Sequence, residues 1–165
     1  MKTNLLLSLL PLALVFTMFS CSSDETEETS TDNTLVQNYD YNSDELKLAA
    51  DINSYRESIG LNSLEIINHI SYKSEEHNEY MIANKVVNHD YFLQRSENIM
   101  HVLGAVKVNE NVAYNFVTTE GALAAWLDSP GHKANIEGDF TSFGISITVD
   151  PDTGKKYFTN IFMKK

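Results

Sequence analysis

Residues 143–163 carry the pattern that most restricts how this chain can fold. Between 143 and 149, large apolar residues alternate with small or polar ones, which predicts a strand with one buried face. The sequence Asp-Pro-Asp-Thr-Gly at 150–154 is a strong turn signal, and residues 157–163 are again apolar and rich in β-forming types. Two such runs joined by a short turn predict an antiparallel hairpin, so at least part of the fold is an antiparallel sheet.

Helical patterns precede the hairpin. Asn42 and Glu45 have the spacing of a capping box, and the apolar residues that follow recur every three or four positions until Gly60. The residues of this stripe are Leu48, Ile52, Tyr55 and Ile59. A second Asn-x-x-Glu pattern at 62–65 predicts the start of a second helix. The residues expected to face inward from that helix are Ile67, Ile70, Ser74, His77 and Met81.

A third helix is expected between Thr118 and Pro130. Thr118 is a suitable N-cap, Glu120 favours the first turn, and Pro130 ends the helix. Residues 131–136 predict a further short helical turn that stops at Gly138. Helices early in the chain, strands late and mixed connections favour the α+β class, with helices covering an antiparallel sheet.

Residues 1–20 have the features of a secretory signal peptide. Lys2 supplies a positive charge, and residues 5–19 are almost continuously apolar but too short for a stable membrane span. Cys21, the only cysteine, follows directly. Its position resembles the cleavage site of a bacterial lipoprotein, in which this cysteine becomes the first mature residue and carries the lipid. The alternative is ordinary cleavage near Ser20, which leaves Cys21 as a free thiol.

Residues 21–42 are expected to form an acidic, disordered tether between the lipidated cysteine and a folded domain at 43–165. Eight acidic residues and no lysine or arginine occur in 22–45, which has few large apolar groups to bury. An acidic stretch after a lipidated cysteine also resembles a surface-export signal of some Gram-negative lipoproteins, and a generic spacer is the alternative. We therefore expect an extracytoplasmic lipoprotein of the outer membrane or cell surface.

The net charge of −11 limits the partners of the chain. Acidic residues outnumber basic ones in the expected domain as well, which argues against nucleic acid and against electrostatic adhesion to anionic lipid. Membrane contact is expected through the acyl chain on Cys21.

A lipidated Cys21 leaves the domain without a cysteine, so its stability depends on a packed core. We expect a monomer whose partner is a protein, a lipid or another envelope ligand.

Three segments carry residue combinations too specific for a generic core. They are Asn-His-Asp at 88–90, Glu-Asn-Val-Ala at 110–113 and Trp-Leu-Asp-Ser-Pro-Gly-His-Lys-Ala-Asn-Ile at 126–136. In this order, they resemble the signature of the CAP superfamily (cysteine-rich secretory protein, antigen 5 and pathogenesis-related 1; SCP/PR1-like). The resemblance runs from about Leu48 to Phe162. Further matching residues are Asn53, Arg56, Gly60, Leu61, Phe140 and Gly144.

The resemblance implies a three-layer α-β-α sandwich around an antiparallel sheet, with a cleft lined by histidines and glutamates. His89, Glu110 and His132 match three of the positions that line this cleft in the family. A second glutamate of many eukaryotic members is replaced here by Ser129, as is common in bacterial forms. Asn111, which follows Glu110 directly, is included in the expected cleft.

Two imidazoles and a carboxylate are ligand types that zinc prefers. Some members of the family bind a divalent metal in the cleft, so zinc or another divalent metal at His89, Glu110 and His132 is one expectation. The alternative is a polar cluster in which Glu110 orients an imidazole and His132 caps the short helix after Pro130. The sequence leaves both open, because these residues lack the tight spacing of a zinc-binding helix.

Hydrolysis and lipid binding are further alternatives. Ser129 and His132 lie close in the sequence, and proteolytic activity has been proposed for some family members. However, Ser129 and Pro130 also suffice to end one helix before the next, and the sequence has no Gly-x-Ser-x-Gly elbow. Sterol or fatty-acid binding would use an apolar groove and exposed aromatic residues, for which the candidates are Tyr91, Phe92, Tyr114 and Phe116. We favour a binding or interaction module over an enzyme.

Overall fold

The computed structural model describes residues 33–165, and the expected signal peptide and Cys21 lie outside this range. The helices are α1 (Ser43–Ser58), α2 (Asn68–Asn84), α3 (Phe92–Leu103), α4 (Thr119–Asp128) and α5 (Pro130–Ile136). The strands are β1 (Glu65–Ile66), β2 (Lys107–Tyr114), β3 (Ser142–Val149) and β4 (Lys156–Lys164). Within residues 33–165, the helices are too short or too polar to span a membrane.

The four strands form one sheet in the order β1-β3-β4-β2. The C-terminal hairpin is confirmed: β3 and β4 pair antiparallel from Ser142 opposite Met163 to Val149 opposite Lys156. β2 pairs antiparallel with the other side of β4 and leaves its own outer side at the edge of the sheet. The short β1 is parallel to β3 and is the exception to the antiparallel expectation.

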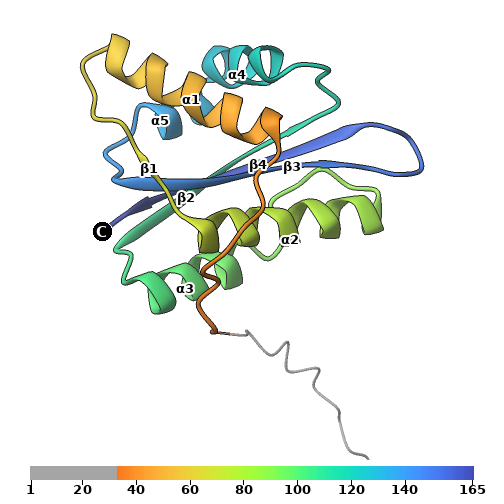
Figure 1. The fold of residues 1–165 in the computed structure, drawn as a ribbon, viewed down its shortest axis with the longest axis horizontal. Coiled ribbons are helices and arrows are strands. Elements are labelled where there is room, and N and C mark those ends of the chain that lie inside the picture. Colours follow the sequence, from red (N-terminus) through yellow and green to blue (C-terminus); the bar gives the residue numbers. More distant parts are fainter. Residues whose placement is uncertain (1–32) are drawn as a thin grey trace, which may run out of the picture. The chain divides into compact units, whose positions relative to one another are not determined.

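Helices cover both faces of the sheet, as Figure 1 shows, with α1, α4 and α5 on one face and α2 and α3 on the other. Alternating side chains of β4 supply both cores: Phe158 and Phe162 pack toward α1 and α4, whereas Ile161 and Met163 pack toward α2 and α3. The sheet is therefore buried on both faces by apolar residues. This arrangement confirms the α+β class and the three-layer sandwich.

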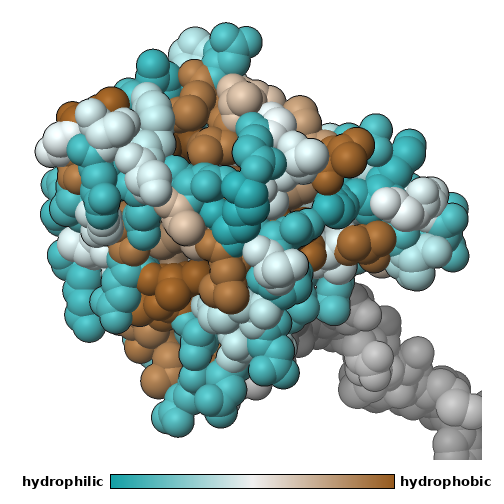
Figure 2. Space-filling view, turned by 45° about the horizontal axis from the view of Figure 1, so that its top comes forward, coloured by the Kyte–Doolittle hydropathy of each residue, from teal (hydrophilic) through white to brown (hydrophobic). Residues whose placement is uncertain are grey.

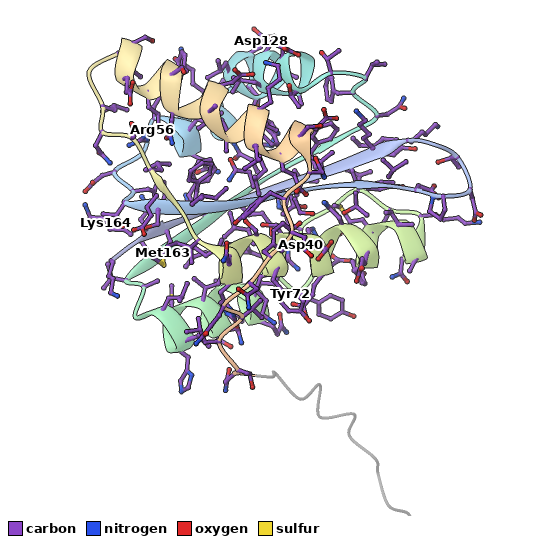
Figure 3. The ribbon with its side chains drawn as sticks, viewed as in Figure 1. Asp40, Arg56, Tyr72, Asp128, Met163 and Lys164 are labelled. Carbon is purple, nitrogen blue, oxygen red and sulfur yellow. The ribbon has the colours of Figure 1, made fainter. Side chains whose placement is uncertain are left out.

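The first helix confirms its capping box but not its whole apolar stripe. The Asn42 side chain accepts from the backbone N–H of Glu45, and the Glu45 carboxylate accepts from that of Asn42. The prediction for Ile59 was wrong, since this residue is 46 % exposed at the C-cap. The completely buried side chain near this end of α1 is Arg56, which points toward the sheet side of the helix in Figure 3.

The second helix begins later than the capping pattern at 62–65 predicts. Asn62 instead bonds to the chain that follows Gly138, its amide donating to the carbonyl of Phe140, and Glu65 enters the sheet as part of β1. α2 starts at Asn68. Of its expected inward side chains, Ile70, Ser74, His77 and Met81 are confirmed as buried, whereas Ile67 is the N-cap and is only partly buried. A Cβ added at Gly144 of β3 would lie 2.3 Å from the backbone nitrogen of Ser71, so only glycine permits this close approach.

Residues 33–42, which the sequence assigns to the disordered tether, form an extended strap against the folded part. The Tyr41 hydroxyl donates to Asn68 of α2, and the Tyr39 hydroxyl reaches Ser146 of β3. The Asn42 amide donates to the carbonyl of Ile147. Within residues 33–165, no strand other than β1 pairs with this side of β3. The backbone of Ile147 bonds instead to Asn42 and Glu45, and the N–H of Ile145 donates to Ser71 of α2. Covering an edge in this way prevents further strand pairing.

Apolar side chains also reach the surface, and in Figure 2 they form patches bordered by hydrophilic residues. Val106 and Val117 are the most exposed of the large apolar residues, at 74 % and 86 %. They flank opposite ends of β2.

Candidate functional site

The Glu110 carboxylate is buried at the centre of a charged cluster. Glu110 lies on β2, and its side chain is 2 % exposed. Arg95 of α3 donates from Nε to Oε2 over 3.0 Å and from Nη2 to Oε1 over 2.9 Å. Its third nitrogen donates to the carbonyl of Asp90 over 2.6 Å. This bidentate geometry fixes the carboxylate and compensates its charge.

His89 is the exposed member of the cluster. Its Nδ1 lies 2.8 Å from Glu110 Oε1, and its side chain is 52 % exposed. Because a carboxylate accepts hydrogen bonds, Nδ1 carries a proton and donates it to Glu110, and Nε2 takes no part in this bond. The backbone around His89 is held by its neighbours, since the Asn88 side chain accepts from the N–H of Asp90 and donates to its carboxylate.

His77, on α2, is a second histidine near the Glu110 carboxylate. Its Nε2 donates to the carbonyl of Asn88 over 2.9 Å and lies 3.8 Å from Glu110 Oε1. Within residues 33–165, the buried Nδ1 of His77 has no hydrogen-bond partner. Burial lowers the pKa of His77, and the negative charge of Glu110 opposes that shift. The neutral imidazole is therefore the form that this position favours.

A ladder of asparagines joins β2 to α5 on the other face of the sheet. Asn109 donates to Asn135 Oδ1 over 2.7 Å, and Asn135 donates to Asn111 Oδ1 over 2.8 Å and to the carbonyl of Glu110 over 3.2 Å. Asn111 in turn donates to the carbonyl of His132 over 3.0 Å. The ladder positions α5, which is too short to hold its place by helix propensity alone.

His132 is half-buried on α5. Burial lowers its pKa first, and the positive charge that His89 can carry lowers it further. What places His132 beside β2 is its carbonyl, which accepts from the side chain of Asn111, the residue after Glu110. Of the three predicted site residues, His89 and Glu110 are hydrogen-bonded to each other, and His132 is linked to β2 through its backbone carbonyl.

An open cleft of about 340 Å³ lies at this edge, lined by His89, Phe92, Asn109, Glu110 and Asn135. Asn111 is completely buried beneath it. Ser129 lies at the junction of α4 and α5, and within residues 33–165 no hydrogen bond joins its hydroxyl to an imidazole or carboxylate. Of the predicted site residues, His89 and Glu110 line the cleft, Asn111 and His132 support or adjoin it, and Ser129 stands apart.

The residues at this edge do not fit a three-ligand metal site. Among residues 33–165, no three histidine, cysteine, aspartate or glutamate side chains are grouped to hold a metal ion. Both Glu110 oxygens accept from Arg95, and Oε1 also accepts from His89. A guanidinium thus occupies the place where a cation would compensate the carboxylate, and the observed role of Glu110 is to orient His89.

Sequence reasoning missed Arg95 and gave His77 no role. The helical period places His77 on the inward face of α2, which was the available signal. Arg95 had no comparable signal, because its pairing with Glu110 depends on how α3 packs against β2.

The aromatic residues considered for lipid binding lie in separate places. Tyr91 is exposed and contacts Tyr80, with ring centroids 5.1 Å apart, whereas Phe92 lines the cleft. Tyr114 packs on Tyr157 with centroids 4.7 Å apart. Phe116 packs on Phe158. They do not form one apolar groove.

Comparison with known families gives a match over most of the chain. The model of the cysteine-rich secretory protein family, CAP, matches residues 49–162. These residues include every strand and helix except the start of α1 and the end of β4. Each of the three motif segments that carry the resemblance in the sequence lies inside the matched range.

Bacterial proteins are among those with related sequences or structures. The chain is 37 % identical over 60 residues to the uncharacterized membrane protein YlbC of Bacillus subtilis and spans 16 % of its length. An outer surface protein of Borrelia burgdorferi has a similar fold, with a TM-score of 0.69 and 23 % identity over 77 % of this chain and 96 % of that one. An extracellular SCP-domain protein of Bacillus anthracis gives a TM-score of 0.65 and 22 % identity over 74 % of this chain and 40 % of that one.

Proposed function

Because the chain belongs to the cysteine-rich secretory protein (CAP) family, we propose that it is a lipid-anchored binding module of the bacterial envelope. Its cleft at the edge of β2 is the binding site, with His89 as the exposed contact and Glu110 as the residue that orients it. The observation that carries this proposal is the saturation of the Glu110 carboxylate by Arg95 and His89.

A carboxylate whose two oxygens already accept hydrogen bonds, as those of Glu110 do, suits a binding site better than proton transfer. Its oxygens already accept four contacts from charged or polar donors, so the geometry stabilises one fixed arrangement. The result is a rigid rim at the cleft, which lowers the entropy lost when a ligand binds. The Ser-based hydrolase lacks a base bonded to Ser129 in the described part of the chain, and zinc binding lacks a free carboxylate.

The anchor and the location are proposed from the sequence and from the relatives. A positive residue, an apolar run and a single cysteine at position 21 have the order of a lipoprotein leader. The Borrelia burgdorferi relative is named an outer surface protein, and the Bacillus anthracis relative is named an extracellular protein. Both names support an extracytoplasmic location for this chain.

The anchor is tested by expressing the full-length protein in bacteria that are fed an alkyne fatty acid. We expect the label on the wild-type chain and none on Cys21→Ser, with Cys21→Ser released from the membrane fraction. Ser20→Ala is a neighbouring control that keeps the cysteine and should remain labelled. Equal labelling of the wild type and Cys21→Ser would contradict the anchor.

The binding role is tested on residues 31–165, which form one compact unit with apolar cores on both sheet faces. The measurement is the saturable binding of this fluorescently labelled unit to envelope fractions of the producing bacterium. We expect His89→Ala to weaken binding about tenfold, because it removes the exposed imidazole of the cleft. His101→Ala, an exposed histidine near the other end of α3, is the matched control and should bind normally.

Two outcomes would contradict the binding role. One is the absence of saturable binding by the wild-type unit. The other is cleavage of envelope peptides or esters by the wild type that Ser129→Ala and His132→Ala abolish, which would establish the hydrolase. A zinc titration by calorimetry accompanies these assays, and we expect no saturable zinc binding that depends on Glu110.

A further inference from the structure

We propose that the cleft recognises a neutral carbohydrate, a sugar ring or two of an envelope glycan. The inference rests on the proposed binding function and adds the chemical class of the ligand. It follows from three properties of the cleft: its polar groups, its charge balance and its aromatic wall.

The polar groups of the cleft are mostly amides held in place by one another. Asn109 bonds to Asn135, and Asn135 bonds in turn to Asn111 and to the backbone of β2. Within residues 33–165, the side-chain amide of Asn109 donates one N–H to this ladder. Its other N–H and its side-chain oxygen are therefore available at the cleft. Fixed groups that both donate and accept match sugar hydroxyls, which also do both.

The charges near the cleft are balanced within the protein. The Glu110 carboxylate is compensated by Arg95, and neither side chain is more than 9 % exposed. The Nδ1 of His89 donates to the same carboxylate, so the imidazole is also paired within the protein. A strongly charged ligand would therefore find no unpaired opposite charge among the lining residues. A neutral ligand needs no such charge, so the internal pairing of Glu110 does not weaken its binding.

Phe92 supplies the apolar wall. Its half-buried ring lines the cleft beside His89 and packs against the core cluster of α2, α3 and the sheet. An aromatic ring fixed by packing offers a flat apolar surface at low entropic cost. The C–H face of a sugar ring is the apolar surface that stacks on such a ring, while its hydroxyls point to the amides.

An extended peptide fits this edge less well. β2 is an edge strand, and added peptides usually pair with the free backbone of such an edge. Here the carbonyl of Glu110 accepts from Asn135, and the carbonyl of Val112 accepts from the indole of Trp126 over 3.0 Å. These side chains block strand addition. The cleft volume of about 340 Å³ also lies at the small end of ligand sites.

The test measures calorimetric binding of chitotetraose, maltotetraose and mannotetraose to residues 31–165, and envelope binding before and after periodate oxidation of the envelope. We expect saturable binding of at least one oligosaccharide and loss of envelope binding after periodate, which cleaves sugar diols. Phe92→Leu keeps an apolar side chain but removes the ring, and Asn109→Asp keeps the size but adds a charge. Each should weaken both kinds of binding about tenfold, with His101→Ala unchanged.

Two results would overturn the inference. Envelope binding that survives periodate but is abolished by protease treatment of the envelope would show a protein ligand and leave the binding function intact. Oligosaccharide binding that is equal in wild type, Phe92→Leu and Asn109→Asp would place the sugar elsewhere. Absence of envelope binding before any treatment would instead contradict the proposed function itself. Thermal unfolding of each variant confirms that a loss of binding is not a loss of fold.

Discussion

The two buried arginines of this protein are held in opposite ways. Arg56 donates to the carbonyls of Asn62, Ile136 and Gly138 at 2.6–2.9 Å, so its main partners are neutral backbone groups. Arg95 donates chiefly to the carboxylate of Glu110. Burial lowers the pKa of both guanidinium groups. The opposing charge is that of Asp139 for Arg56 and chiefly that of the hydrogen-bonded Glu110 for Arg95.

The difference separates a structural role from a role at a site. Arg56 joins the end of α1 to the turn after it and to the end of α5, and Tyr55 adds a second link from α1 to the end of α5 through Glu137. Arg95 compensates one carboxylate whose other contact is an exposed imidazole at a cleft. A buried cation bonded to carbonyls is part of the scaffold, whereas one paired with a carboxylate can set the charge of a binding surface.

The largest expected effect is that of Arg56→Met. The substitution leaves the buried carbonyl of Ile136 and its neighbours without donors, and we expect a loss of about 4 kcal/mol in the free energy of unfolding. Urea unfolding followed by circular dichroism measures it. Lys47→Met, on the exposed side of α1, is the matched control. A loss no larger than the control would show that Arg56 is dispensable to the scaffold.

Arg95→Met should destabilise somewhat less, by about 3 kcal/mol, because it leaves the buried Glu110 carboxylate without its cation. The double variant Arg95→Met with Glu110→Gln should recover most of that loss, since no buried charge remains. No single side-chain change can rescue Arg56→Met in the same way. The distinction between the two arginines fails if the double variant is as unstable as the sum of its single variants.

Acid should weaken the Arg95 side of the molecule through His77. The folded-state pKa of His77 is lowered by burial, so the unfolded chain binds this proton more readily. The associated stability is complete above the unfolded pKa near 6.5 and is lost as pH falls from there toward the folded pKa. His132 shifts in the same direction but is more exposed. Urea midpoints measured from pH 7.5 to 5 should fall less steeply in His77→Phe than in wild type or His101→Phe.

The smallest effect on stability is expected for His89→Ala. Its imidazole is 52 % exposed, and Glu110 keeps the bidentate contact from Arg95 when the ring is removed. We expect a change below about 1 kcal/mol in the free energy of unfolding, together with the tenfold weaker envelope binding proposed above. A large destabilisation would show that His89 supports the fold. The contrast between the structural role of Arg56 and the site around Arg95 would then fail.

Local patterns were the predictable part of this fold. The capping box at Asn42 and Glu45 and the C-terminal hairpin depend on residues a few positions apart, and both formed as expected. The similar pattern at 62–65 failed because its asparagine bonds across the fold to Phe140, which sequence spacing does not reveal. The same reason explains Ile59 and Arg56: periodicity identified the face of α1, but distant carbonyls decided which side chain at its end is buried.

The sequence motifs named two residues that line the cleft, His89 and Glu110, but not the electrostatics of the cleft. The motifs at 88–90, 110–113 and 126–136 located His89, Glu110 and His132. They could not show that Arg95, fifteen residues before Glu110 and in another element, completes the cluster. The partner of a buried charge is decided by helix packing, and packing is not encoded in the spacing of one motif.

The strap at residues 33–42 determines how the protein responds to mechanical load. Its hydrogen bonds are arranged in series, from Val36 on His69, through Tyr39 on Ser146, to Asn42 on Ile147. A pull on the chain before residue 33 therefore reaches these bonds one after another, and each resists with only about 1 kcal/mol. The strap should peel at low force before the paired strands of the sheet, which must break many bonds together, carry any tension.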